Sequence, residues 1–289
     1  QSVKEVKKVD DHTVDVILKG PSPVVLRELT DARIMNKAWA EKNNATKAQD
    51  YKAKEENFAS RNANGTGPFI LEAWQPDTRT TLKKNADWWD KPRGNVDNIV
   101  FTPIKAAATR SAALISGQVD MVVDPPVQDL ERIKRDANIK VIEGPENRTI
   151  FLGFDQHRDE LMGSNVKGKN PLKDKRVRQA LYQAVDIAAI EKNVMRGLGK
   201  PTGTMIAPMV NGWTKELGAR AAKFDVNAAK KLLADAGYPQ GFELTLDCPN
   251  DRYVNDEAIC QAVTAMWTRI GVKTRLRTNP MSIHSAKIQ

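Results

Sequence analysis

Residues 226–278 read VNAAKKLLADAGYPQGFELTLDCPNDRYVNDEAICQAVTAMWTRIGVKTRLRT, and this stretch alternates helical and strand patterns. Val226–Ala236 has helical spacing and is followed by Gly237, a typical helix stop. Phe242–Cys248 carries an apolar side chain at every second position, as a strand with one buried face does. Asp256–Ile270 is the clearest helix, with one apolar stripe formed by Ile259, Val263, Met266, Trp267 and Ile270. Val272–Thr278 then returns to a strand pattern.

The first half of the chain begins with two strand candidates, Val3–Val9 and Thr13–Leu18, joined at Asp10-Asp11. After residue 97 it alternates strand and helix, with strands predicted at 98–104, 119–123 and 139–142 and helices at 106–116 and 127–137. Such alternation is an α/β signature. In the second half we expect a strand at 149–155 and helices at 174–185 and 186–196, with Asp174 and Asp186 as their N-caps.

The length of 289 residues favours about two domains. The best boundary is Gly144-Pro145, which predicts one domain over residues 1–145 and another over residues 146–289. No stretch reaches the roughly 18 uninterrupted apolar residues that a membrane helix needs. The opening QSVKEVKKVDDHTVDV already has a strand pattern, so we expect no signal peptide in it.

The charge balance is basic: 45 Lys and Arg against 36 Asp and Glu give a formal net charge of +9. A basic surplus is compatible with an anionic partner. The basic residues are, however, spread along the chain without a block or interleaved aromatic residues. We therefore expect a solvated basic surface and no nucleic-acid partner, and keep a basic nucleic-acid-binding domain as an alternative class.

Motifs for enzyme chemistry are missing from the sequence. It contains no GxSxG elbow, no Walker loop, no HExxH and no strand-linked GxGxxG. Adjacent carboxylates such as Asp159-Glu160 point apart on helices and strands, so they do not predict a catalytic pair. We predict no catalytic residue and no cofactor, and keep a cleft hydrolase as the alternative enzyme class.

Two cysteines, Cys248 and Cys260, bear on metal binding and on redox compartment. They do not form a CxxC motif, and the three histidines do not cluster near them, so we predict no metal site. Cys248 ends a predicted strand and Cys260 lies in the first turns of the next helix, an arrangement that brings such positions within disulfide range. In an oxidising compartment a bridge is favoured over buried free thiols.

Seven runs, taken together and in order, resemble the family 5 extracellular solute-binding proteins, the dipeptide-, oligopeptide- and nickel-type substrate-binding components of ABC importers. The runs are VKKVDDHTVDVILKGPSP, GTGPFILEAWQP, LKKNADWWD, VDNIVFTPI, ATRSAALISGQVDM, NPLKDKRVRQALYQAVD and AKKLLADAGYPQGFELTL. They span nearly the whole chain, and their common order makes the resemblance specific.

The resemblance implies an α/β, periplasmic-binding-protein-like (type II) bilobed architecture with mixed sheets flanked by helices. Residues 1–145 then correspond to part of lobe I and residues 146–289 to part of lobe II. Compared with the family, the chain is expected to be an incomplete copy that lacks both ends. We therefore expect it to bind ligand more weakly than a full-length protein.

The resemblance also selects ligand-binding positions, which are Asp124, Pro125, Asn147, Arg148, Phe151 and Met195. Asp124 is suited to pair with a ligand ammonium and Arg148 to form a forked bond to a carboxylate. For these two, an ordinary hinge ion pair or surface charge is the competing interpretation. For Phe151 it is packing between the lobes.

The function that the resemblance implies is capture of a small ligand, foremost a peptide, between the lobes and its delivery to the permease subunits in the membrane. Nickel chelates and small oligosaccharides are the alternative ligand classes. The protein is expected to be a non-enzymatic monomer that acts in the periplasm, or outside the cell as an extracellular protein anchored to the membrane. The permease would recognise its closed form.

Overall fold

A computed structural model describes residues 2–50, 52–144 and 146–288. The chain divides into two compact units, residues 1–103 and 104–289. Pro145, the predicted domain boundary, lies outside the described residues, and the assignment of residues 1–145 and 146–289 to two lobes stays a prediction. Within the described residues, no helix has both the length and the apolar character needed to cross a membrane.

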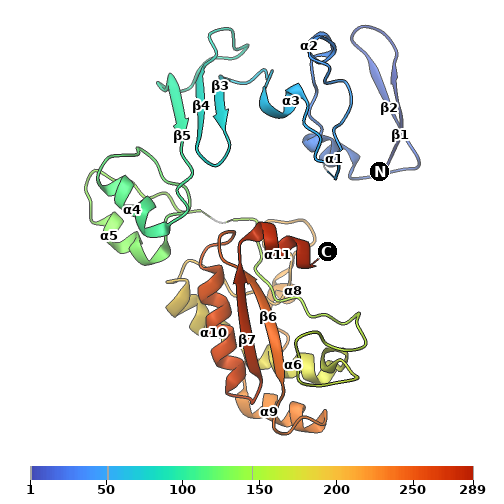
Figure 1. Cartoon of the computed structure of the whole chain (residues 1–289), viewed down its shortest axis with the longest axis vertical. Helices are drawn as coiled ribbons and strands as arrows, with labels where there is room; N and C mark the ends of the chain where they lie inside the picture. The colour runs from blue at the N-terminus through green and yellow to red at the C-terminus, as the bar shows by residue number, and fades with distance from the viewer. Residues whose placement is uncertain (1, 51, 145, 289) are drawn as a thin grey trace. The chain divides into compact units, whose positions relative to one another are not determined.

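Unit 1 contains two small antiparallel sheets and short helices (Figure 1). Strands β1 (Val3–Lys8) and β2 (Val14–Leu18) lie within the two ranges predicted as strands and pair antiparallel, and the second sheet has the order β3-β4-β5. Its strands are β3 (Phe69–Gln75), β4 (Arg79–Lys84) and β5 (Asn98–Phe101). The helices are α1 (Val25–Glu28), η1 (Leu29–Asp31), α2 (Lys37–Lys42) and α3 (Phe58–Arg61).

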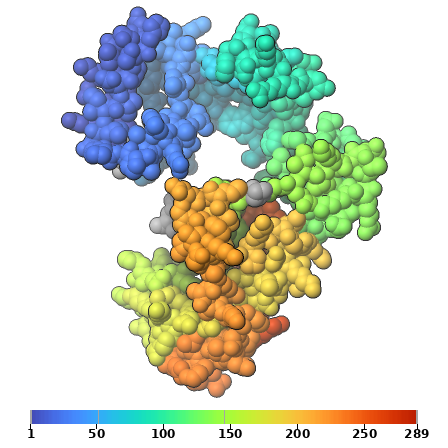
Figure 2. All heavy atoms as spheres, turned by 180° about the vertical axis from the view of Figure 1, so that it is seen from behind, coloured from blue at the N-terminus to red at the C-terminus, as the bar shows by residue number. Residues whose placement is uncertain are grey.

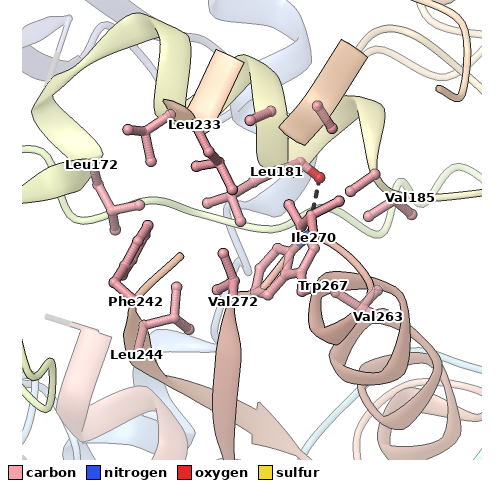
Figure 3. Close-up of a cluster of buried hydrophobic side chains, with 14 of the residues drawn as sticks. Leu172, Leu181, Val185, Leu233, Phe242, Leu244, Val263, Trp267, Ile270 and Val272 are labelled. Atoms are coloured by element: carbon pink, nitrogen blue, oxygen red, sulfur yellow. Dashed lines mark hydrogen bonds between the residues drawn. The ribbon is translucent and has the colours of Figure 1, made fainter. Parts of the chain in front are cut away.

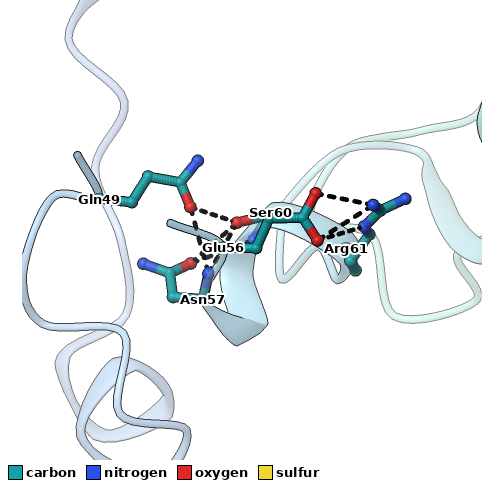
Figure 4. Close-up of polar contacts among 5 residues, drawn as sticks. All are labelled: Gln49, Glu56, Asn57, Ser60 and Arg61. Atoms are coloured by element: carbon teal, nitrogen blue, oxygen red, sulfur yellow. Dashed lines mark hydrogen bonds and ion pairs between the residues drawn. The ribbon is translucent and has the colours of Figure 1, made fainter. Parts of the chain in front are cut away.

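The start of α3 is fixed by polar side chains (Figure 4). Asn57 caps the helix by accepting from the backbone N–H of Ser60 at 3.2 Å, and the Ser60 side chain accepts from the backbone N–H of Asn57 at 3.1 Å. Gln49 accepts hydrogen bonds from both residues. Arg61 forms a forked ion pair with Glu56, the shorter bond being 2.7 Å. This short helix is therefore held by its caps and charges rather than by a buried face.

Unit 2 is built around the strand–helix–strand unit formed by β6 (Glu243–Pro249), α10 (Asp256–Thr268) and β7 (Lys273–Asn279). The two strands pair in parallel, with Leu246 opposite Leu276, and α10 packs against both (Figure 1). The other helices are α4 (Ala107–Ile115), η2 (Val127–Asp129), α5 (Leu130–Lys134), η3 (Pro171–Lys173), α6 (Lys175–Gln183), α7 (Ile187–Ala189), the π-helix η4 (Ile190–Val194), α8 (Lys215–Gly218), α9 (Val226–Asp235) and α11 (Met281–Ile288).

The core of unit 2 lies between this strand–helix–strand unit and the pair α6 and α9 (Figure 3). Leu181 from α6, Leu233 from α9 and Val263 from α10 are all buried here. Trp267, only 2% exposed, fills the centre. The apolar stripe predicted on residues 256–270 is therefore the face that packs, and it fixes where the strand ends lie.

Side chains distant in sequence cap the carboxyl end of α6. A helix leaves its last carbonyls without partners inside the helix. Here the indole N–H of Trp267 donates to the Leu181 carbonyl at 3.0 Å, and Arg220 donates to the carbonyls of Tyr182 and Val185. The buried end of α6 is thereby satisfied, which couples it to α10 and to the segment around Arg220.

Several sequence predictions hold in unit 2 and others are wrong. Asp174 and Asp186 are N-caps as predicted, accepting from backbone N–H groups at 2.8 and 3.0 Å. A hydrogen bond from the Arg176 guanidinium also lowers the pKa of Asp174 below its ordinary value. The strands predicted at 119–123, 139–142 and 149–155 are irregular, and the helix predicted at 186–196 is divided into α7 and η4. An extended segment is a strand only when a neighbour pairs with it, and none does so within the described residues.

Candidate functional site

The carboxyl ends of β6 and β7 are the natural place for a site in unit 2, because open α/β sheets bind ligands outside this edge. Residues 250–255 leave β6 at this edge and lead into α10. A disulfide between Cys248 and Cys260, 1% and 8% exposed, ties the end of the strand to the helix. The buried Asp256 carboxylate accepts the backbone N–H groups of Arg252 and Tyr253 at 3.1 and 3.0 Å. The loop is thus held at both ends.

An aromatic ring in this loop lies against two cations. The guanidinium carbon of Arg148 is 5.5 Å from the centre of the Tyr253 ring, and that of Arg252 is 5.1 Å from it. Arg148 also pairs with Glu146 at 2.8 Å, whereas no ion pair of Arg252 with a carboxylate occurs among the described residues. Because Glu146 neutralises Arg148, the positive charge left beside Tyr253 is that of Arg252, which suits an anionic ligand group.

Asn255 connects the same loop to two other segments. Its backbone is left-handed, with φ of 55°, immediately before α10. Its Nδ2 donates to the Val194 carbonyl at the end of η4 at 2.8 Å, and its Oδ1 accepts from Gln128 Nε2 at 3.2 Å. The loop 250–255 therefore contacts η2, η4 and the segment that carries Arg148.

A groove of about 780 Å³ lies between η2 and α5 on one side and η4 with the residues after it on the other. Figure 2 shows these two sides as neighbouring green and gold segments. The lining combines the apolar Val127, Leu130 and Leu198 with the polar or charged Gln128, Glu131, Lys134, Glu191, Lys192 and Arg196. A hydrogen bond to Glu143 raises the pKa of Lys134 above its ordinary value. The positive charge of this lysine is therefore already paired with a carboxylate. Lys192 and Arg196 have no ion pair among the described residues.

One of the six predicted ligand positions contacts the loop 250–255 directly, and two others lie close in sequence to residues that contact it. Arg148 contacts Tyr253 directly, Met195 follows the residue that binds Asn255, and Pro125 lies half-buried just before η2.

Asp124 is exposed and left-handed, with φ of 52°, and its carbonyl accepts from Arg110 at 3.4 Å. Asn147 is exposed and Phe151 is 58% exposed, and among the described residues neither forms a hydrogen bond, ion pair or ring contact with the loop. Ligand contact by all six positions stays a prediction.

Sequence reasoning missed the residues that organise the site. The three residues lie between the best-predicted strand and the best-predicted helix, and they are Arg252, Tyr253 and Asn255. This position in the sequence is the one feature that could have pointed to them as site residues. A polar Arg-Tyr pair directly after a strand lies at its carboxyl edge. The left-handed backbone of Asn255 could not be predicted in this way, because the sequence shows only that asparagine tolerates that conformation. Among the described residues, no group of three or more His, Cys, Asp or Glu side chains is arranged to hold a metal ion.

Comparisons with known proteins agree across the chain. Residues 1–286 match the family described as "Bacterial extracellular solute-binding proteins, family 5 Middle". The dipeptide-binding protein of Escherichia coli (strain K12) is 32% identical over 282 residues, which cover 96% of this chain and 49% of that protein. Heme-binding protein A of Haemophilus influenzae is 30% identical over 278 residues, 94% of this chain and 47% of that protein. The chain thus spans about half the length of these curated relatives.

Solved structures show the same fold. The oligopeptide-binding protein AppA from Bacillus subtilis, solved in complex with a nonapeptide, superposes with a TM-score of 0.80 at 21% identity. The superposition covers 99% of this chain and 56% of AppA.

Proposed function

The chain belongs to the family 5 bacterial extracellular solute-binding proteins, and from this premise we propose that it captures a peptide for an ABC importer. Membership confirms the resemblance seen in the sequence, together with the α/β, periplasmic-binding-protein-like fold class. The relatives include proteins named for dipeptide binding, which supports a peptide as the ligand. We place its action in the periplasm, as a monomer that binds without breaking bonds and delivers its cargo to permease subunits.

The observation that carries this proposal is the arrangement of Arg148, Tyr253 and Arg252 at the carboxyl edge of β6. A peptide has a free carboxylate, which a guanidinium binds through two parallel hydrogen bonds. The Tyr253 ring orients both guanidinium groups by stacking at 5.5 and 5.1 Å. Arg252 is the better binding partner for the peptide carboxylate, because its charge has no carboxylate partner within the described part of the chain. Arg148, in contrast, already forms an ion pair with Glu146.

The opposite end of the peptide requires an anion. The exposed carboxylate of Asp124 is the candidate partner for the ligand ammonium, as the sequence suggests. Capture then proceeds by closure, since a ligand held from both lobes stabilises the state in which both contact it. The apolar part of the groove, at Val127, Leu130 and Leu198, is available for side chains of the peptide.

Isothermal titration with trialanine, trialanine amide and N-acetyl-trialanine tests the proposal. The amide lacks the carboxylate, so it should bind at least about 10-fold more weakly, the effect of losing a charge-assisted hydrogen bond. Arg252→Ala should weaken trialanine by a similar factor and no longer distinguish it from the amide. Arg269→Ala, an exposed arginine at the end of α10, is the matched control and should bind like the wild type.

Two results would overturn the proposal: no binding of trialanine, or equal binding of trialanine and its amide. A nickel–histidine chelate and a small oligosaccharide, the other ligand classes suggested by the sequence, serve as competitors in the same titration. Displacement of trialanine by either at lower concentration would replace the peptide as the preferred ligand.

A further inference from the structure

One hydrogen bond in unit 2 joins segments on either side of the predicted lobe boundary. Gln128 Nε2 donates to Asn255 Oδ1 at 3.2 Å, although 127 residues separate the two. Within residues 104–144 and 146–288, as far as the structure describes them, it is the one hydrogen bond or ion pair that connects these two ranges. If residue 145 divides the lobes, Gln128 belongs to lobe I and Asn255 to lobe II.

Both ends of this bond are held in place by their own segments. The Asn255 amide donates to the Val194 carbonyl at 2.8 Å, which turns its oxygen toward Gln128. Gln128 stands in η2 between Val127 and Leu130, which are both buried. Each partner is therefore held within its own range, and this bond is the polar link between the two ranges within the described residues.

The position of the bond relates it to the groove. Gln128 lines the groove, and its partner Asn255 belongs to the loop that also carries Arg252 and Tyr253. A bond at this place is made when η2 and the loop approach each other, which is the movement expected on closing around a ligand. Gln128 is exposed, so the bond competes with water and is weak enough to open again.

We propose that Gln128 and Asn255 form a latch that biases the protein toward its closed state. The inference rests on the proposed function, because closure has a role only if a ligand is captured. Gln128 and Asn255 are positioning residues: they act on the equilibrium between open and closed forms and need not touch the ligand.

Spin labels at Ala137→Cys and Arg269→Cys, both exposed and one in each range, report this equilibrium by electron–electron distance measurement. The chain's own two cysteines are joined to each other, so labelling is confined to the introduced thiols. Gln128→Ala and Asn255→Gly should each raise the ratio of long to short distances about 2- to 5-fold, the lower part of the range for one hydrogen bond. Glycine keeps the left-handed backbone of residue 255 accessible.

The double variant decides whether the two residues act together. It should change the distances no more than Asn255→Gly alone does, because that variant already removes the bond to Gln128 together with the bond from Asn255 to the Val194 carbonyl. Gln179→Ala, which removes an exposed glutamine from α6, is the matched control and should leave the distances unchanged. Identical distance distributions in the wild type and all variants, or additive changes in the double variant, would overturn the latch.

Trialanine binding separates this inference from the proposed function. The latch predicts that Gln128→Ala lowers the affinity by the factor by which the closed fraction falls in the distance measurement, whereas Gln179→Ala keeps the wild-type affinity. If trialanine fails to bind the wild type, the proposed function is wrong while the ligand-free distances still report on the latch.

Discussion

Removal of the disulfide should lower the stability of unit 2 and, at the same time, make the loop 250–255 less ordered. Cys248 and Cys260 are 12 residues apart, and both are buried. A cross-link that closes so short a loop lowers the entropy of the unfolded chain by an amount worth about 3 kcal/mol at 25 °C. The loop it closes contains Arg252 and Tyr253, so its loss should also weaken trialanine binding.

The assay is urea unfolding of the double variant Cys248→Ala/Cys260→Ala, followed by tryptophan fluorescence, with the oxidised wild type as reference. We expect the free energy of unfolding of unit 2 to fall by about 3 kcal/mol, plus a smaller loss from the two small cavities. The wild type after reduction is the control, since it loses the bridge but keeps both sulfur atoms. A decrease below about 1 kcal/mol in both samples would refute the entropic argument, and unchanged trialanine affinity would refute the role of the bridge in ordering the loop.

The remaining predictions concern the scaffold of unit 2. Trp267→Phe should lower the free energy of unfolding by about 2–4 kcal/mol, because it leaves a buried carbonyl unpaired and a gap, whereas Trp89→Phe, at an exposed indole, should change it little. Gly241→Ala should be more destabilising than Gly237→Ala in urea unfolding: both glycines have positive φ, but only at 241 would a Cβ overlap backbone atoms. Asp174→Asn keeps the N-cap acceptor but removes the carboxyl group whose pKa is lowered by folding. That lowered pKa stabilises the wild type above the unfolded value of about 3.9, so below it the wild type should lose stability with falling pH more steeply than the variant does.

Local sequence patterns correctly predicted those helices and strands whose formation depends mainly on interactions between residues close in the sequence. The helix expected at 256–270 and the strand expected at 242–248 lie within two residues of α10 and β6. Here the apolar period, the N-terminal acidic residues and the closing glycine all favour one structure, so tertiary packing reinforces the local preference.

Local sequence patterns gave wrong predictions where the structure of a segment depends on a partner far away in the sequence. Val119–Val123 has strand composition, yet no strand in the described part of the chain pairs with it, so the segment stays irregular. The helix predicted at 186–196 becomes the π-helix η4 after a single turn, and the Val194 carbonyl at its end binds Asn255, which lies 61 residues further along the chain. The role of Tyr253 escaped prediction for the same reason: its contact with Arg148 comes from the fold and is not visible in the sequence alone.

We propose that a peptide carboxylate binds at Arg148, Tyr253 and Arg252. Side-chain NMR of the arginine Nε–H groups during titration with trialanine tests it most directly. We expect saturable shifts of the Arg148 and Arg252 signals that are absent with trialanine amide. Shifts confined to other arginines, or the same shifts with the amide, would contradict it.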